Sequence, residues 1–146
     1  MTTPKAASVT DPLEALPGYL LRRAALAAVN ELNEQLTPLG LRHADVALLM
    51  LVDALPKLTQ SEAGRLLDVQ RANMVAFVGR LQRRGLIARE RVDGRSFALV
   101  LTPAGKRQLA AAQQTVKTYE HALLQRVPKA LRPMVMPILL ALWKGE

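Results

Sequence analysis

The 146-residue sequence contains no cysteine, which excludes disulfides, cysteine-zinc sites, thiol catalysis and thiol-based redox sensing. Aromatic residues make up only 3% of the chain, and its two histidines, His43 and His121, are too far apart in sequence to suggest a metal pair. The longest apolar runs, such as residues 134–143, are about half the roughly 18 residues needed to cross a bilayer, and no signal peptide is visible. We therefore expect a cytoplasmic protein with no metal, no cofactor and no membrane contact.

Acidic residues are scarce relative to basic ones. Twenty Lys and Arg against twelve Asp and Glu leave a net charge of +8. Between Arg65 and Arg107, ten basic and three acidic residues leave +7 in under a third of the chain, and nine of the ten are arginine. Arginine suits bidentate contacts with phosphate or guanine. This local excess of positive charge is consistent with DNA as the partner. Taken alone, however, it is explained equally well by a basic face that only contacts solvent.

Half of the residues are apolar, and the length suits one domain with its own core. The first ten residues are polar or small, which predicts a disordered tail. An apolar residue then recurs every fourth position from Leu16 until Pro38, as in an amphipathic helix. Residues 42–55 are apolar nearly all round, which is typical of a helix buried at the centre of a small domain.

Two short helices are expected next. Thr59 and Glu62 have the spacing of a capping box, which predicts a helix to about residue 67. A second helix is predicted over residues 71–84. Its spacing gives a core face of Met74, Phe77, Val78 and Leu81, and a separate, basic and free face of Asn73, Ala76, Arg80 and Arg84.

A hairpin is expected after the second helix. Residues 87–91 and 96–101 alternate in polarity around Asp93-Gly94, and Phe97, Leu99 and Leu101 are expected on one side of the second strand. Two helices followed by a hairpin is the order of a winged helix-turn-helix. Its second helix enters the major groove of DNA, while the hairpin, or wing, follows the backbone and reaches the minor groove.

The C-terminal part is predicted to be helical. Thr102-Pro103 opens a long helix with near-heptad apolar spacing, and Pro133 and Pro137 kink or break the segment after it. The surplus of apolar residues at both ends predicts an obligate homodimer. The fold class is mainly α with a small two-stranded wing. We divide the chain into a disordered tail (1–10), an N-terminal dimerisation helix (11–40), a winged helix-turn-helix DNA-binding lobe (41–102) and C-terminal dimerisation helices (103–146).

Residues 58–109 resemble the core of the MarR-type transcriptional regulators. In that family the helix-turn-helix ends in Leu-x-x-x-Gly-Leu, a wing with Asp-x-Arg follows, and Leu-Thr-x-x-Gly comes after it. These elements are here Leu81 to Leu86, Asp93-Gly94-Arg95 and Leu101 to Gly105. Each is weakly specific, but their order and spacing together are strong, and the resemblance extends over about residues 11 to 144.

The resemblance implies a homodimeric repressor whose two winged helices read an approximate palindrome in double-stranded DNA. It places Arg71, Asn73 and Arg80 on the recognition helix. In such wings the Asp holds an Arg in place and the Arg meets the DNA, roles that fall here to Asp93 and Arg95. With the other arginines of the helix and wing, the expected DNA-binding set is Arg71, Asn73, Arg80, Arg84, Arg89, Arg91, Asp93 and Arg95.

Three positions depart from the family pattern. Val92 directly precedes Asp93, so that the wing is about two residues shorter than usual. Gln70 stands where a small N-cap residue is common. Gly79 lies in the middle of the recognition helix, at a cost of about 1 kcal/mol relative to Ala unless something packs closely there.

Many members of the family respond to small aromatic or lipophilic ligands between the dimerisation helices and the DNA-binding lobe. Rough placement puts Tyr19, Arg23, His43 and Met50 in such a pocket. Structural roles explain each of the four better: core packing for Tyr19 and Met50, a salt bridge for Arg23, and a cap or surface position for His43.

Other classes of function remain as alternatives. A sequence-independent architectural DNA-binding protein needs only the basic charge. A purely protein-binding dimer needs only the apolar ends. An enzyme is disfavoured, because the chain has no cysteine nucleophile, no glycine-rich phosphate loop and only scattered acids.

Overall fold

The computed structural model describes residues 11–145, so the tail predicted for residues 1–10 lies outside the described part. The predicted fold class, mainly α with a two-stranded antiparallel hairpin, is confirmed. The elements, including three short 3-10 helices (η), are η1 (Pro12–Ala15), α1 (Pro17–Leu36), η2 (Thr37–Leu39), α2 (His43–Ala54), α3 (Gln60–Leu66), α4 (Arg71–Arg83), β1 (Ile87–Arg91), β2 (Phe97–Leu101), α5 (Pro103–Gln125), η3 (Lys129–Leu131) and α6 (Arg132–Lys144).

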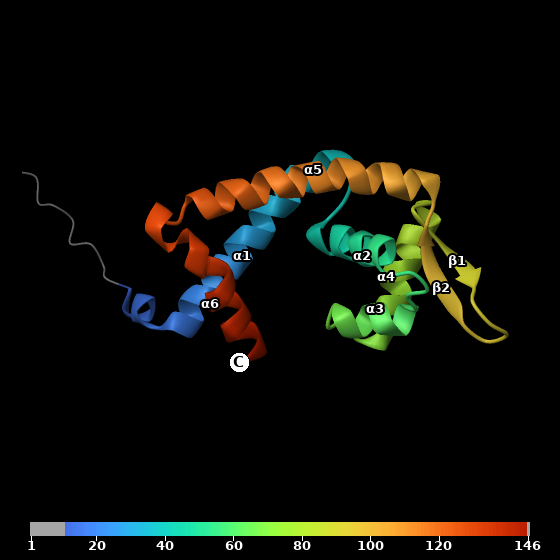
Figure 1. The fold of residues 1–146 in the computed structure, drawn as a ribbon, viewed down its shortest axis with the longest axis horizontal. Coiled ribbons are helices and arrows are strands. Elements are labelled where there is room, and N and C mark those ends of the chain that lie inside the picture. The colour runs from blue at the N-terminus through green and yellow to red at the C-terminus, as the bar shows by residue number, and fades with distance from the viewer. Residues whose placement is uncertain (1–10, 146) are drawn as a thin grey trace, which may run out of the picture.

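The long helix α5 connects two parts of the molecule, as Figure 1 shows. One of its ends adjoins the hairpin and the bundle of α2, α3 and α4, and the other lies near α1 and α6. Along its length α5 packs against β2, α2 and α1. Two polar contacts tie it to α1: the Tyr119 hydroxyl donates to the Ala28 carbonyl at 2.9 Å, and Arg126 forms a bidentate ion pair with Glu31.

Side-chain caps set the starts of α3 and α5, as the sequence predicts. Thr59 and Glu62 form the reciprocal capping box of α3, with the Thr59 amide donating to the Glu62 carboxylate at 2.9 Å. The Thr102 hydroxyl accepts from the Gly105 amide at 2.9 Å and donates to the Gly85 carbonyl at 2.5 Å. Thr102 thereby fixes the start of α5 against the turn that ends the α4 segment.

The core lies where α2, α4, β2 and α5 meet. Gly105 is required there, because a Cβ at this position would collide with the carbonyl oxygen of Leu86. The buried cluster confirms that α2 is central, and it includes Leu36, Leu41, Val46, Leu48, Leu49, Met74, Val78, Leu81, Leu86, Ile87, Leu99, Leu109 and Ala112.

The hairpin pairs Ile87 with Leu101 and Arg91 with Phe97. Phe97 and Leu99 alternate along β2 as predicted, but they differ in burial, since Phe97 is 44% exposed while Ala98 and Leu99 are both buried. Leu99 donates its amide to the Leu58 carbonyl at 2.8 Å, and Ala98 bridges to Thr59. The segment before α3 therefore covers this part of β2, whereas Phe97 lies beyond the covered stretch, toward the tip.

The two ends of the chain carry uncovered apolar side chains. Helix α6 continues through Pro137 and has no buried residue, and the break in the C-terminal segment falls instead at η3. The exposed apolar side chains include Leu16, Leu20, Leu21, Leu26, Met134, Met136, Ile138, Leu139, Leu142 and Trp143. Among the helices within residues 11–145, none is both long enough and apolar enough to span a membrane.

Candidate nucleic-acid interface

Helices α3 and α4 form a close pair joined by a tight turn. Asp68 in this turn adopts a left-handed conformation (φ 52°), and the Val69 amide donates to the Gly64 carbonyl at 2.8 Å. A Cβ on Gly64 would lie 2.9 Å from Met74 Cγ, so glycine allows the two helices to approach. The helix-turn-helix is therefore held by backbone contacts, although Gln70 makes no side-chain cap at the start of α4.

Helix α4 buries Met74, Val78 and Leu81 and exposes the opposite side. Phe77, expected on the core face, is partly buried and packs against the core. Arg71 and Asn73 are exposed in the first turn, and their side chains make no hydrogen bond within the described residues. The N-terminal turn of α4 thus presents an arginine and an asparagine that can bind a ligand.

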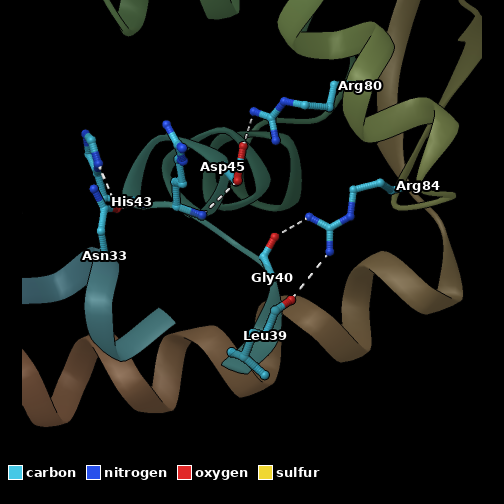
Figure 2. A network of polar contacts seen from close by, with 8 residues as sticks. Asn33, Leu39, Gly40, His43, Asp45, Arg80 and Arg84 are labelled. Carbon is cyan, nitrogen blue, oxygen red and sulfur yellow. Dashed lines mark hydrogen bonds and ion pairs between the residues drawn. The ribbon is translucent and has the colours of Figure 1, made fainter. Parts of the chain in front are cut away.

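Arg80 lies on an exposed side of α4, as expected, but its guanidinium is not free. Its guanidinium donates to Oδ1 of Asp45 at 2.5 Å (Figure 2). It also lies over the Phe77 ring, 5.4 Å from the centroid. Asp45 is only 1% exposed, and its Oδ2 accepts from the Arg42 amide at 2.8 Å. A buried carboxylate needs a cation or hydrogen-bond donors to offset the cost of removing it from water. Arg80 supplies both to Asp45 and thereby connects α4 to the start of α2.

Arg84 is exposed as well, and its guanidinium is bound to a neighbouring turn. Its guanidinium donates to the carbonyls of Gly40 at 2.6 Å and Leu39 at 3.4 Å (Figure 2). These carbonyls belong to the turn between η2 and α2, which Arg84 holds against the end of α4. One feature of the sequence points to the contact between Arg80 and Asp45: Asp45 is an acid near the start of a segment that is apolar nearly all round.

The wing turn is built around Asp93. Its Oδ1 accepts from the amides of Arg95 at 2.9 Å and Ser96 at 2.8 Å, and these bonds hold the pKa of the Asp93 carboxyl below its ordinary value. The resemblance implied that Asp93 holds an arginine side chain. In the structure it holds the backbone at Arg95, whose side chain is left exposed at the tip.

The other two wing arginines each have a partner within the lobe. Arg91 lies over the exposed ring of Phe97, 5.5 Å from its centroid. Arg89 donates to Oε1 of Gln60 at 2.7 Å, which connects β1 to the start of α3. Both arginines are exposed, and these contacts restrict where their guanidinium groups lie.

An open cleft of about 740 Å³ lies between α3, the start of α4 and the wing. The cleft brings together residues that are far apart in sequence. Among its lining residues, Asp68 is the acidic one. Gln60 and Arg65 were not singled out in the sequence as site residues. The polar lining that can meet a phosphate backbone consists of Gln60, Ser61, Arg65, Arg71, Arg89 and Arg95.

The four residues expected around an effector lie on α1 and α2. Arg23 donates to the Tyr19 hydroxyl at 3.0 Å, and His43 contacts Oδ1 of Asn33 through its amide at 2.8 Å and its ring Nδ1 at 3.2 Å. Met50 is 42% exposed, so core packing does not explain it. None of the four lines the cleft at the wing.

Comparison with known proteins gives relatives of one kind. The sequence model of the MarR family matches residues 39–96. A protein of Thauera aromatica, named as the transcriptional regulatory protein for the hcr operon, is 29% identical over 132 residues, which are 88% of this chain and 80% of that protein.

Solved structures of transcriptional repressors are similar to this chain over most of its length. The transcriptional repressor CouR bound to p-coumaroyl-CoA has a TM-score of 0.86 at 31% identity, covering 96% of this chain and all of that one. CouR bound to a 23-mer DNA duplex has a TM-score of 0.83 at 34% identity, covering 89% of this chain and 94% of that one. The fold, the winged helix-turn-helix and these similarities together show that the chain belongs to the MarR family of transcriptional regulators.

Proposed function

We propose that this regulator is a non-catalytic, cytoplasmic repressor that binds a pseudo-palindromic operator as a homodimer, with half-sites about 10 base pairs apart. The observation that carries the proposal is the juxtaposition of the arginine-lined cleft with the exposed first turn of α4. The cleft offers donors for phosphates, and the helix offers Arg71 and Asn73 for base edges. A purely protein-binding dimer has no need of this combination.

The DNA-binding set that we propose follows from which side chains remain available. Arg71 and Asn73 face outward from α4, and Arg65 and Arg95 line the cleft. Arg89 lines it too, with one of its guanidinium nitrogens donating to Gln60 and the rest of its donors left for a phosphate. Arg91 supports the wing through Phe97, and Asp93 supports it through the turn. Arg80 and Arg84 act indirectly, by holding α4 against the start of α2 and against η2.

We infer the dimer from the apolar side chains that the chain leaves uncovered on α1 and α6. Residues 11–40 and 103–146 would then supply the interface, and residues 41–102 the DNA-binding lobe. Monomeric proteins rarely expose contiguous apolar patches of this kind. Sedimentation equilibrium at micromolar concentration should give twice the chain mass of 16.0 kDa, and a folded monomer would contradict the proposal.

We further propose that the effector is a coenzyme A thioester of an aromatic acid. The similarity to CouR supports this class, since that repressor is described with p-coumaroyl-CoA bound. Tyr19, Arg23, His43 and Met50 on α1 and α2 are our candidates for its contacts, with Arg23 offering a cation for its phosphates.

The test is fluorescence anisotropy with the DNA upstream of the protein's own gene against random DNA at one fixed salt concentration. A specificity ratio of about 10³ or more supports a regulator, and a ratio near one indicates an architectural DNA-binding protein. Titration with p-coumaroyl-CoA, free p-coumarate and free coenzyme A then tests the effector. Release by the thioester alone supports the proposed class, and release by p-coumarate alone contradicts it.

A further inference from the structure

The outward ridge of helix α4 is apolar. Ala72, Val75, Ala76 and Gly79 follow the spacing i, i+3, i+4 and i+7, which places them in one row along a helix. This row, the outer ridge, lies opposite the buried Met74, Val78 and Leu81. None of its members has a side chain that can donate or accept a hydrogen bond.

Solvent exposure of the ridge is unusual for a helix in so basic a lobe. Val75 is 55% exposed, and Ala72 and Ala76 are exposed with it. Polar residues normally occupy the solvent side of an amphipathic helix. Arg80, the flanking cation expected beside this ridge, is drawn away to Asp45.

No neighbour within residues 11–145 requires the glycine of this ridge. A Cβ on Gly79 would meet only the flexible end of the Arg83 side chain at 3.2 Å, whereas Gly64 and Gly105 face close neighbours. The ridge therefore combines one valine with three positions that carry little or no side chain. Such a surface allows the helix axis to come close to whatever binds it.

We propose that Val75 is a specificity-determining residue that reads the C5-methyl group of a thymine in each half-site. This inference rests on the proposed function, which puts α4 in the major groove. The thymine methyl is the apolar feature that base pairs display in that groove, and small apolar side chains recognise it by contact. The small residues of the ridge let the two methyl groups of Val75 reach the base edges, while Arg71, four residues earlier on the helix, lies beside the contact.

The experiment begins with the full-length protein and a pool of random duplexes, from which the preferred operator is selected. Each thymine of that operator is then replaced singly by deoxyuridine, which removes the methyl group and leaves base pairing unchanged. Affinities are measured for the wild type, for Val75→Ala and for a matched control, Leu66→Ala. Leu66 is 56% exposed and lies on α3, outside the ridge.

We expect at least one thymine in each half-site at which deoxyuridine lowers the affinity of the wild type about fourfold, the factor for one buried methyl group. Because Val75→Ala changes both protomers of the dimer, it should bind the thymine operator about as weakly as the wild type binds an operator that carries deoxyuridine at that position in both half-sites. It should also lose its sensitivity to deoxyuridine at that position, and Leu66→Ala should keep the fourfold effect. Because Val75 is exposed, circular dichroism should show an unchanged fold.

Two outcomes overturn the inference while the proposed function stands. One is a selected operator in which no deoxyuridine substitution changes affinity. The other is a sensitive thymine whose effect is the same in Val75→Ala as in the wild type. If instead the wild type prefers no duplex over random DNA, the proposed function fails, and the role of Val75 fails with it.

Discussion

Replacing Arg80 with alanine tests whether this arginine serves folding or base recognition. In the structure its guanidinium is the cationic partner of Asp45, which is 1% exposed, while the Arg80 side chain is 45% exposed. Arg80→Ala would leave the buried carboxylate with the Arg42 amide as its remaining donor. We therefore expect the substitution to destabilise the folded protein.

The magnitude follows from the burial of the two partners. Removing one partner of a fully buried ion pair costs about 3–5 kcal/mol. Water screens the exposed part of Arg80, and the Arg42 amide still satisfies one oxygen of Asp45, so we expect a smaller loss in the free energy of unfolding, about 2–3 kcal/mol. For a chain of this size the melting temperature should fall by about 5–10 °C.

The assay is urea unfolding followed by circular dichroism, at one fixed protomer concentration because a dimer's stability depends on it. Arg83→Ala is the matched control, since Arg83 is exposed on the same helix and makes no ion pair within the described residues. It should change the unfolding free energy by no more than about 0.5 kcal/mol. The double variant Asp45→Asn/Arg80→Ala has no unpaired buried charge and should recover about 1–2 kcal/mol relative to Arg80→Ala.

The opposite result would refute this reasoning. If Arg80→Ala unfolds at the urea concentration of the wild type but loses about 1–3 kcal/mol of operator affinity per half-site, Arg80 reads a base edge. Asp45 would then be satisfied without it. Loss of stability combined with unchanged sequence preference supports the structural role.

Two further predictions concern helical glycines and the wing. Gly79→Ala should raise the free energy of unfolding by about 0.5–1 kcal/mol, because helix propensity improves and only the Arg83 side chain has to move. Gly105→Ala should instead lower it by about 1–3 kcal/mol or more, since the new Cβ meets the Leu86 carbonyl. Equal thermal melting shifts for both would contradict this account. For the wing, the lowered pKa of Asp93 means that its bonds to the Arg95 and Ser96 amides persist above the ordinary carboxyl pKa and are lost as pH falls through the lowered value. NMR shifts of those two amides should titrate with a midpoint below about 3.9, the ordinary value, and a midpoint at or above it would exclude the hydrogen bonds.

Most of the helices and strands that the sequence predicted are determined by residues close to one another in the chain. The capping residues Thr59 and Thr102 set the starts of α3 and α5, and the apolar periodicity predicted α2 as the central helix. Each of these features depends on residues within one or two turns of one another, so they can be predicted from the sequence alone. The hairpin around Asp93-Gly94 is predicted for the same reason.

Contacts between distant residues account for the corrections. Phe97 alternates correctly along β2, but the burial of its neighbour Ala98 depends on Thr59, nearly forty positions away. Arg89 similarly finds Gln60 on another element. Helical spacing places a Cα on a face, whereas a long arginine side chain can turn toward a neighbouring element. A pattern in one segment cannot show which element lies within that reach.

Arginine count and arginine availability answer different questions about this lobe. The excess of positive charge predicts a polyanionic partner, because attraction depends on charge and distance. Arg84 donates to neutral carbonyls and therefore still adds its charge to that attraction, whereas Asp45 cancels most of the charge of Arg80. Reading a base edge requires, in addition, donors that the protein has not already used. Composition could therefore predict the class of partner, but it could not show that the Arg80 guanidinium is already paired with Asp45. We propose that discrimination between bases falls instead to the first turn of α4 and to the outer ridge.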